Sequence, residues 1–401
     1  METVGIVGEY NPFHSGHAYH LAKTREALGG ECAVVCALSG DYVQRGEAAT
    51  YAKYARAEAA CRCGVDLVLE LPLPWCLASA EGFARGAVGI LDALGQCTHL
   101  SFGSECGDLE LIKNTAMALA DPAMNAAVKD ELGGGISYAA ARQEALRKRA
   151  PELAAVLDTP NNILAVEYVK AIYQDGAHLE PVTVGRVGAG HDETGSGGPK
   201  SASEIRHGMA EGADMTDYMP AEAARVFTRE ETIGRGFMSP EMLETAVVSR
   251  LRMLPAEAFG RLPDAGGGVG DALYKAVREE PGLDSIAAAA KSRGCAMSRI
   301  RRMIMCAALG VTSGMTDGVP PYTRVLAVNG RGREILRAAA GTTDIPIVTK
   351  PADVRALSPR CAGLFALGAD AHDLYVLGRR ASEERRGGAD WRTGPCIVQS
   401  D

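Results

Sequence analysis

Short apolar segments alternate with helix-like segments over the first quarter of the chain. The candidate strands are Val4–Gly8, Cys32–Leu38, Val65–Leu71 and Thr98–Phe102. Each is apolar without alternation, which is typical of parallel strands whose two faces are both covered by helices. Ahead of the last strand, Ala80–Leu94 carries apolar residues at the helical period. The pattern predicts an α/β fold whose N-terminal, Rossmann-like domain contains a mostly parallel sheet.

The pattern becomes mainly helical after these strands. Residues 109–174 are predicted to form a helical insertion, and Pro181–Ala189 to return as a strand. From residue 213 onward the pattern is again mainly helical. We therefore predict an N-terminal domain over residues 1–212 and a mainly helical C-terminal domain over 213–378. We expect residues 379–401 to be a disordered tail, because they are charged and lack apolar periodicity.

Composition adds constraints on location and redox state. Apolar residues make up 47% and charged residues 23% of the chain, as in ordinary soluble globular proteins. No apolar run approaches the roughly 18 residues of a membrane span, and the N-terminus lacks the basic segment of a signal peptide. The 11 cysteines are irregularly spaced without a CxxC pair, so we expect reduced thiols and no zinc site. We expect a cytoplasmic protein without membrane association.

Two histidines follow the first predicted strand, in His14-Ser15-Gly16-His17. In open parallel sheets, ligands bind beyond the carboxyl ends of strands, where helix N-termini offer free N–H groups to anions. His14 and His17 are one helical turn apart, so both can face one phosphate chain. Imidazoles donate hydrogen bonds and can carry a proton near neutral pH, and Gly16 would let a flat ligand approach the backbone. We predict a nucleotide site with His14 and His17 as catalytic residues.

Two other interpretations of these histidines stay open. They could be incidental residues of a surface turn, or His14, His17 and His20 could bind a metal ion. No carboxylate or cysteine stands at a spacing that would complete a metal site. We therefore predict no metal site.

Seven sequence blocks, in this order along the chain, resemble the tRNA(Met) cytidine acetate ligase family of the HxGH nucleotidyltransferase superfamily. The blocks extend from the N-terminus to about Leu377 and are Gly5–His17, Ser39–Glu47, Val65–Pro72, Phe102–Glu105, Pro160–Leu164, Tyr322–Leu326 and Asp373–Tyr375. An HxGH turn alone is a weak signal, whereas these blocks in this order are specific.

The resemblance implies a two-step reaction. The enzyme would activate acetate with ATP to form acetyl-adenylate and pyrophosphate, and would then acetylate N4 of the wobble cytidine of elongator tRNA(Met). ATP would be a substrate accompanied by Mg²⁺, with no permanently bound cofactor and no protein partner.

The resemblance also implies the residues of the ATP site, by motif. They are Val7, Gly8, Glu9, Tyr10, Asn11, Pro12, Phe13, His14, Ser15, Gly16, His17, Ala18, Tyr19, His20, Gly103, Asn162, Arg186 and Val187. An Asn162 amide can both donate and accept toward adenine or ribose, and Arg186 can grip phosphate through paired N–H groups. Gly8 and Ser15 depart from the family pattern, in which larger or amide-bearing residues are expected.

A second block, Ser201–Arg206, resembles the other signature of the superfamily. There Ser201, Ser203 and Arg206 would clamp the β- and γ-phosphates at a helix N-terminus. Ser201 and Glu204 also have the spacing of a capping box, so an ordinary capped surface helix is the alternative. The glycine-rich loop Gly190–Lys200 before it could close over ATP as a lid.

An RNA substrate requires a basic surface on a chain whose net charge is −8. The candidate tRNA contacts are Arg299, Arg301 and Arg302. Further basic clusters are Arg147–Arg149, Lys291 with Arg293, and Arg324 with Arg331 and Arg333. Each cluster could instead be a solvated helix face. Tyr322 could stack on an unpaired base or belong to the core.

Other functions compete with this interpretation. A cofactor-biosynthetic adenylyltransferase shares the HxGH turn but does not account for the long region after Arg206. An aminoacyl-tRNA synthetase would need a lysine-rich KMSKS-like loop, which is missing here. A non-enzymatic nucleotide- or RNA-binding scaffold is disfavoured by the intact HxGH residues.

Overall fold

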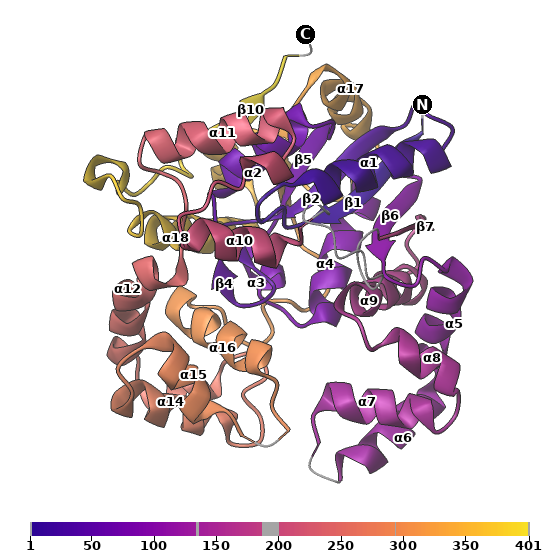
Figure 1. Ribbon diagram of the computed structural model, residues 1–401, viewed down its shortest axis with the longest axis vertical. Coiled ribbons are helices and arrows are strands. Elements are labelled where there is room, and N and C mark those ends of the chain that lie inside the picture. Colours follow the sequence, from indigo (N-terminus) through magenta and orange to yellow (C-terminus); the bar gives the residue numbers. More distant parts are fainter. Residues whose placement is uncertain (1, 134–135, 187–199, 293, 400–401) are drawn as a thin grey trace.

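The computed structural model describes residues 2–133, 136–186, 200–292 and 294–399 (Figure 1). Within them an eight-stranded sheet has the order β10-β8-β5-β2-β1-β6-β7, with β9 paired to β8. Strands β5, β2, β1, β6 and β7 are parallel, whereas β8 is antiparallel to β5. The strands are β1 (Thr3–Gly8), β2 (Ala33–Ser39), β5 (Leu67–Leu71), β6 (His99–Ser104), β7 (Glu180–Gly185), β8 (Thr323–Val328), β9 (Ile347–Val348) and β10 (Cys396–Ile397). The predicted α/β class with a mostly parallel sheet is confirmed.

Successive residues of the central strands enter two different cores, which explains their unbroken apolar pattern. On β2, Val35 and Ala37 pack into one core with helices α4 (Ala80–Ala93) and α9 (Pro160–Asp175). Val34 and Cys36 pack into a second core on the opposite face. The helices of that second face are α1 (Ser15–Ala27), α2 (Lys53–Arg62) and α11 (Ala221–Thr232).

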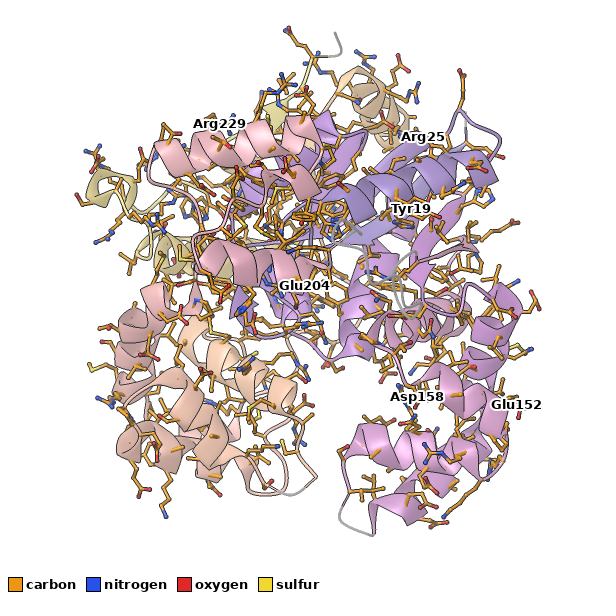
Figure 2. The ribbon with its side chains drawn as sticks, viewed as in Figure 1. Tyr19, Arg25, Glu152, Asp158, Glu204 and Arg229 are labelled. Atoms are coloured by element: carbon orange, nitrogen blue, oxygen red, sulfur yellow. The ribbon has the colours of Figure 1, made fainter. Side chains whose placement is uncertain are left out.

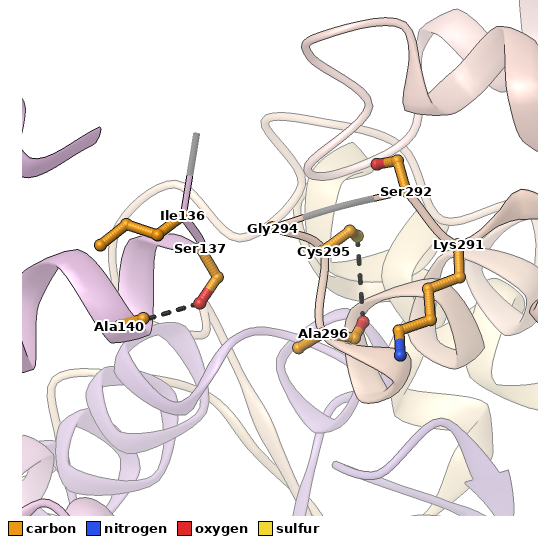
Figure 3. Close-up of a pocket in the computed structure, with 8 residues that line it drawn as sticks. All are labelled: Ile136, Ser137, Ala140, Lys291, Ser292, Gly294, Cys295 and Ala296. Atoms are coloured by element: carbon orange, nitrogen blue, oxygen red, sulfur yellow. Dashed lines mark hydrogen bonds between the residues drawn. The ribbon is translucent and has the colours of Figure 1, made fainter. Parts of the chain in front are cut away.

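Two groups of helices extend from the same end of the sheet (Figure 1). The first group lies within the predicted insertion, residues 109–174, and consists of α5 (Leu109–Ala120), α6 (Pro122–Leu132), α7 (Tyr138–Arg147) and α8 (Pro151–Val156), whereas α9 of the same span packs against the sheet. The second group packs around a third core, to which Leu73 and Tyr375 also contribute, and consists of α12 (Pro240–Met253), α13 (Ala256–Gly260), α14 (Val269–Glu279), α15 (Leu283–Ala290) and α16 (Met297–Leu309). A cavity of about 580 Å³ between the two groups is lined by Ile136, Ser137, Ala140, Lys291, Ser292, Gly294, Cys295 and Ala296 (Figure 3).

The structure differs from the predicted division at residues 212 and 213. Strand β8 is fully buried and pairs with β5, so Arg324 lies opposite Glu70 in the N-terminal sheet. Helices α17 (Gly330–Ala339) and α18 (Pro359–Val376) contribute to the core that contains α4 and α9. The C-terminal segment is therefore not one separate helical domain. Strand pairing across some 250 residues leaves no local signal in the sequence.

The predicted disorder of residues 379–401 is wrong for its described part, residues 379–399. Asp390 is 2% exposed, and its carboxylate accepts hydrogen bonds from Lys53 at 2.5 Å and from Tyr54 at 2.8 Å. Strand β10 then adds to the edge of the sheet beside β8. The charged composition was misleading, because Asp390 neutralises cations inside the protein instead of facing water.

The remaining elements connect these layers. They are the hairpin β3 (Tyr42–Val43) with β4 (Glu47–Ala48), helices α3 (Leu73–Cys76) and α10 (Ala202–Ala210), and the 3₁₀ turns η1 (Thr216–Tyr218), η2 (Pro351–Ala356) and η3 (Ser382–Glu384). Across the described part of the chain, no helix has both the length and the apolar character needed to cross a bilayer.

Candidate active site

The HxGH turn forms the N-terminus of α1 at the carboxyl end of β1. His14 is the N-cap residue, and its Nδ1 accepts the Gly16 N–H at 3.0 Å. His17 Nδ1 accepts the His14 N–H at 3.2 Å, which completes a capping box built from two imidazoles. The ring centroids lie 3.9 Å apart. The structure thus brings the two predicted catalytic residues together.

This pattern determines where each imidazole carries its proton. Because Nδ1 of His14 and of His17 accepts a backbone N–H, a neutral ring must carry its hydrogen on Nε2. Burial, with Arg186 and Arg206 nearby, lowers the pKa of His14 to about 4. Burial, with His14, His20 and Arg186 nearby, lowers the pKa of His17 well below its ordinary value. At neutral pH both residues are therefore uncharged Nε2–H donors, not the protonated imidazoles that the sequence also allowed.

Two glycines make room for aromatic rings. A Cβ at Gly16 would lie 2.8 Å from Cε1 of His14, and one at Gly8 would lie 2.9 Å from Cζ of Tyr10. Gly16 therefore accommodates the His14 ring, which differs from the ligand approach expected from the sequence. Tyr10, at a φ of 44°, packs its ring 4.9 Å from both Phe13 and His17. The aromatic pair fixes the orientation of the His17 ring.

Several other residues predicted for the ATP site pack against the rest of the protein or face solvent. The Asn11 side chain accepts the Thr50 N–H at 2.7 Å, and the Asn11–Pro12 peptide bond is cis. His20 turns toward the sheet, where Nε2 lies 3.0 Å from Ser101 Oγ, and burial lowers its pKa to about 4. Val7, the residue before the end of β1, packs against the core that contains α4 and α9, and Ala18 packs against the core on the opposite face of the sheet. Tyr19 is exposed on α1 (Figure 2).

The ends of β6 and β7 form the second side of the site. Asn162 is 4% exposed, and its Oδ1 accepts the N–H groups of Glu105 at 2.9 Å and Cys106 at 3.2 Å. The amide oxygen is thus committed to the loop, and only the NH₂ group is left for a ligand. Arg186 lies over Gly103, where a Cβ would be in ordinary contact with its Cγ at 3.5 Å. Val187 lies outside the described residues.

Helix α10 forms the third side. Arg206 donates to the backbone oxygen of Asn11 at 2.9 Å and to Ser203 Oγ at 3.1 Å. Ser201 forms the expected capping box with Glu204, so its hydroxyl is used within the helix. Ser201 therefore acts as the cap of an ordinary helix, which was the alternative to a phosphate clamp. Arg206, in contrast, contacts the loop that contains the HxGH turn. Of the predicted lid, residues 190–199 lie outside the described chain.

Sequence reasoning missed Arg56, a fully buried arginine on α2. Its guanidinium donates to the backbone oxygens of Glu9, Ser39, Gly40 and Tyr51. It therefore ties together the carboxyl ends of β1 and β2 beside the site. An arginine in a helix with other charged residues is expected to face solvent, so no local signal revealed that Arg56 is buried.

The basic candidates have different environments. On α16, Arg301 lies 3.1 Å from Glu47 and 3.4 Å from Asp284, and Arg299 donates to the backbone oxygen of Asp264. Burial lowers the pKa of Arg302. Arg324 and Tyr322 are only 2% and 5% exposed, so neither lies on an RNA-binding surface and Tyr322 belongs to the core.

Neutral imidazole donors at a helix N-terminus, flanked by two arginines beyond the strand ends of a parallel sheet, are the arrangement expected of a nucleotidyl-transfer site. In agreement, residues 1–390 match the family described as HIGH Nucleotidyl Transferase.

Comparison with individual proteins narrows this class. A tRNA(Met) cytidine acetate ligase of Acetivibrio thermocellus is 32% identical over 417 residues, covering 99% of this chain and 100% of the relative. That of Syntrophotalea carbinolica is 38% identical, covering 87% and 85%. The crystal structure of Thermotoga maritima TmcAL bound with alpha-thio ATP superimposes with a TM-score of 0.92 at 30% identity, covering 100% of both chains. The apo form of that protein gives 0.93 at 31% identity. The chain belongs to the tRNA(Met) cytidine acetate ligase family.

Proposed function

We propose that this chain is an ATP-dependent ligase that forms acetyl-adenylate and acetylates N4 of the wobble cytidine of elongator tRNA(Met). The observation that carries the proposal is the pair of Nε2–H donors of His14 and His17 at the N-terminus of α1. The full-length similarity to ligases of that name supports the choice of acid and tRNA. Because ATP and tRNA are cytoplasmic substrates, the proposal also locates the enzyme there.

In the first step a carboxylate oxygen of acetate attacks the α-phosphorus and the bond to pyrophosphate breaks. Negative charge grows on the phosphate oxygens, where the two imidazoles donate hydrogen bonds and Arg186 and Arg206 supply positive charge. Mg²⁺ would enter with ATP, since this ion is held largely by substrate phosphates. We propose that ATP lies among Val7–His20, Gly103, Asn162, Arg186, Val187, Ser203 and Arg206.

The proposal predicts which acid supports exchange of pyrophosphate into ATP. Acetate should support it without tRNA, and acids larger by two or more carbons should do so poorly, because a pocket for one methyl group excludes bulk. The measurement is the exchange rate with a panel of carboxylic acids, followed by acetyl transfer to elongator tRNA(Met). Exchange that requires a phosphorylated metabolite would instead favour a cofactor-biosynthetic adenylyltransferase.

We further propose that α16 contacts the tRNA through Arg299, Arg301 and Arg302. Changing Arg299 and Arg301 together to Gln should weaken tRNA binding and reduce its salt dependence, by roughly one unit of log–log slope per lost phosphate contact. Arg302 is left in place because its guanidinium is partly buried. The measurement is affinity against salt concentration, with Lys275→Gln on the exposed face of α14 as the control. Normal tRNA affinity in the folded double variant would show that α16 is only a solvated face.

A further inference from the structure

Acetyl transfer, the second step of the proposed function, releases one proton. The N4 amine attacks the carbonyl carbon of acetyl-adenylate, the bond from this carbon to the AMP oxygen breaks, and AMP leaves. One N4 hydrogen must then pass to a base. We infer that this base is the Glu9 carboxylate, at the junction between the HxGH loop and the β3–β4 hairpin. The inference rests on the proposed function.

His14 and His17 cannot accept this proton in their observed arrangement. Nδ1 of His14 and of His17 is occupied by a backbone N–H, and Nε2 carries the hydrogen. His20 Nε2 lies 3.0 Å from the Ser101 hydroxyl. The nearby arginines offer no acceptor atom.

Two other carboxylates near the site are already engaged. Glu105 accepts hydrogen bonds from Thr159 at 3.0 Å and from the backbone of Asn162 at 2.8 Å, and these bonds lower its pKa. It holds the N-terminus of α9. Glu47 faces Arg301 at 3.1 Å. Neither carboxylate is a free acceptor.

Glu9 is placed differently. Gln44 N–H donates to its Oε1 at 2.7 Å, which orients the carboxylate, and Oε2 has no hydrogen-bond partner within the described chain. Burial raises its pKa even though positive charge opposes the shift. The titratable and charged groups around it are Arg45, Arg56, Arg206, Cys76 and Tyr168. A carboxylate of raised pKa is a stronger base than an ordinary one.

The position of Glu9 also fits the meeting point of two substrates. On one side it precedes Tyr10 and the HxGH turn. On the other, its partner Gln44 lies on the hairpin loop that ends in Gly46, whose φ is 78°. A Cβ at Gly46 would lie 2.5 Å from the backbone nitrogen of Arg302, so the hairpin sits directly on α16. Glu9 thus lies between the proposed ATP loop and the proposed tRNA helix.

The test separates the two steps in one preparation. Wild type and Glu9→Gln are each given synthetic acetyl-adenylate and elongator tRNA(Met), and the single-turnover transfer rate is compared with the rate of ATP–pyrophosphate exchange. We expect the ratio of transfer to exchange to fall about 10²-fold or more in Glu9→Gln, which keeps an acceptor for Gln44. Glu9→Asp should recover part of the ratio, and Glu26→Gln on the outer face of α1 is the control.

The pH dependence gives a second readout. In wild type the transfer rate should rise with pH while Glu9 ionises and then level off, and this rise should be missing in Glu9→Gln. An unchanged ratio, or an equal fall of both rates, would overturn the role of Glu9 as the base. If wild type itself transfers no acetyl group from acetyl-adenylate to tRNA, the proposed function fails. If wild type and Glu9→Gln transfer the acetyl group at the same rate, only the role of Glu9 as the base is overturned.

Discussion

Replacing His17 with alanine is expected to lower ATP–pyrophosphate exchange about 10²–10³-fold, the usual cost of losing one donor to developing charge. The Nε2–H of His17 would stabilise the transition state more than bound ATP, so the loss should appear in kcat. The substitution also removes the acceptor for the His14 N–H. The measurement is exchange kinetics together with a thermal unfolding curve.

Two further variants separate the ligand donor from the helix cap. Asparagine at position 17 places an oxygen near the position of Nδ1 and keeps the cap, but it lacks a donor at Nε2. Glutamine places an amide near Nε2 and loses the cap. His17→Asn should therefore be almost as inactive as His17→Ala, and His17→Gln should be more active. His178→Ala, with a side chain 92% exposed, is the matched control. Near-normal exchange in a folded His17→Ala protein would refute the assigned role.

The assigned role of His17 also predicts the pH dependence of the exchange reaction. Because the pKa of His14 is lowered to about 4, both imidazoles of the free enzyme stay neutral from neutral pH down to about pH 5. kcat/KM for ATP in the exchange reaction should show no ionisation near the ordinary histidine pKa of about 6.5. An ionisation near that value which disappears in His17→Asn would mean that a protonated imidazole is the active form.

Replacing Asp390 with alanine is expected to lower the free energy of unfolding by about 3–5 kcal/mol, the cost of leaving buried cations without their partner. Lys53 is 2% exposed at its side chain and lies 2.5 Å from Asp390, while Arg324 lies 3.4 Å away. Asp41 and Glu70 also face Lys53 and would offset part of the loss. The measurement is urea denaturation of the full chain.

Glu383→Ala, an exposed carboxylate of the same tail, is the control and should change stability by less than about 0.5 kcal/mol. Lys53, His372 and Arg324 hold the pKa of Asp390 below its usual range despite its burial. The folded-state pKa is lowered, so its stabilisation is present at neutral pH. It is lost as pH falls from the ordinary aspartate pKa through the folded value. Equal stability of Asp390→Ala and Glu383→Ala would mean that the tail is dispensable.

The fold was predictable where its signals are local. Strands β1, β2, β5 and β6 were located to within about two residues because both faces of each are largely buried, and α4 was located by its apolar stripe. Strand β8 was missed because a short apolar run among helices does not reveal that it pairs with β5. The tail was missed because composition cannot distinguish a charge facing water from one facing a buried lysine.

The candidate site was also predicted from the sequence only where its signals are local. The sequence located His14 and His17 on one helical turn, and the structure places them in contact. The sequence did not predict that the amide oxygen of Asn162 accepts a hydrogen bond from the backbone N–H of Glu105. Nor did it predict that Gly16 makes room for the His14 ring. Both depend on side-chain directions at atomic distances, and residue spacing does not specify these.

The sequence by itself determined the α/β class, the HxGH turn after the first strand and the family resemblance, since each depends on residues that are close together in the sequence. Only the tertiary structure decided that β8 and the tail complete the sheet, that Arg56 holds the strand ends, and that the histidines are neutral donors. The physical reason is that burial and charge arise from residues distant in the chain. Arg186 and Arg206 act on His14 across more than 170 positions, and no local pattern records their approach.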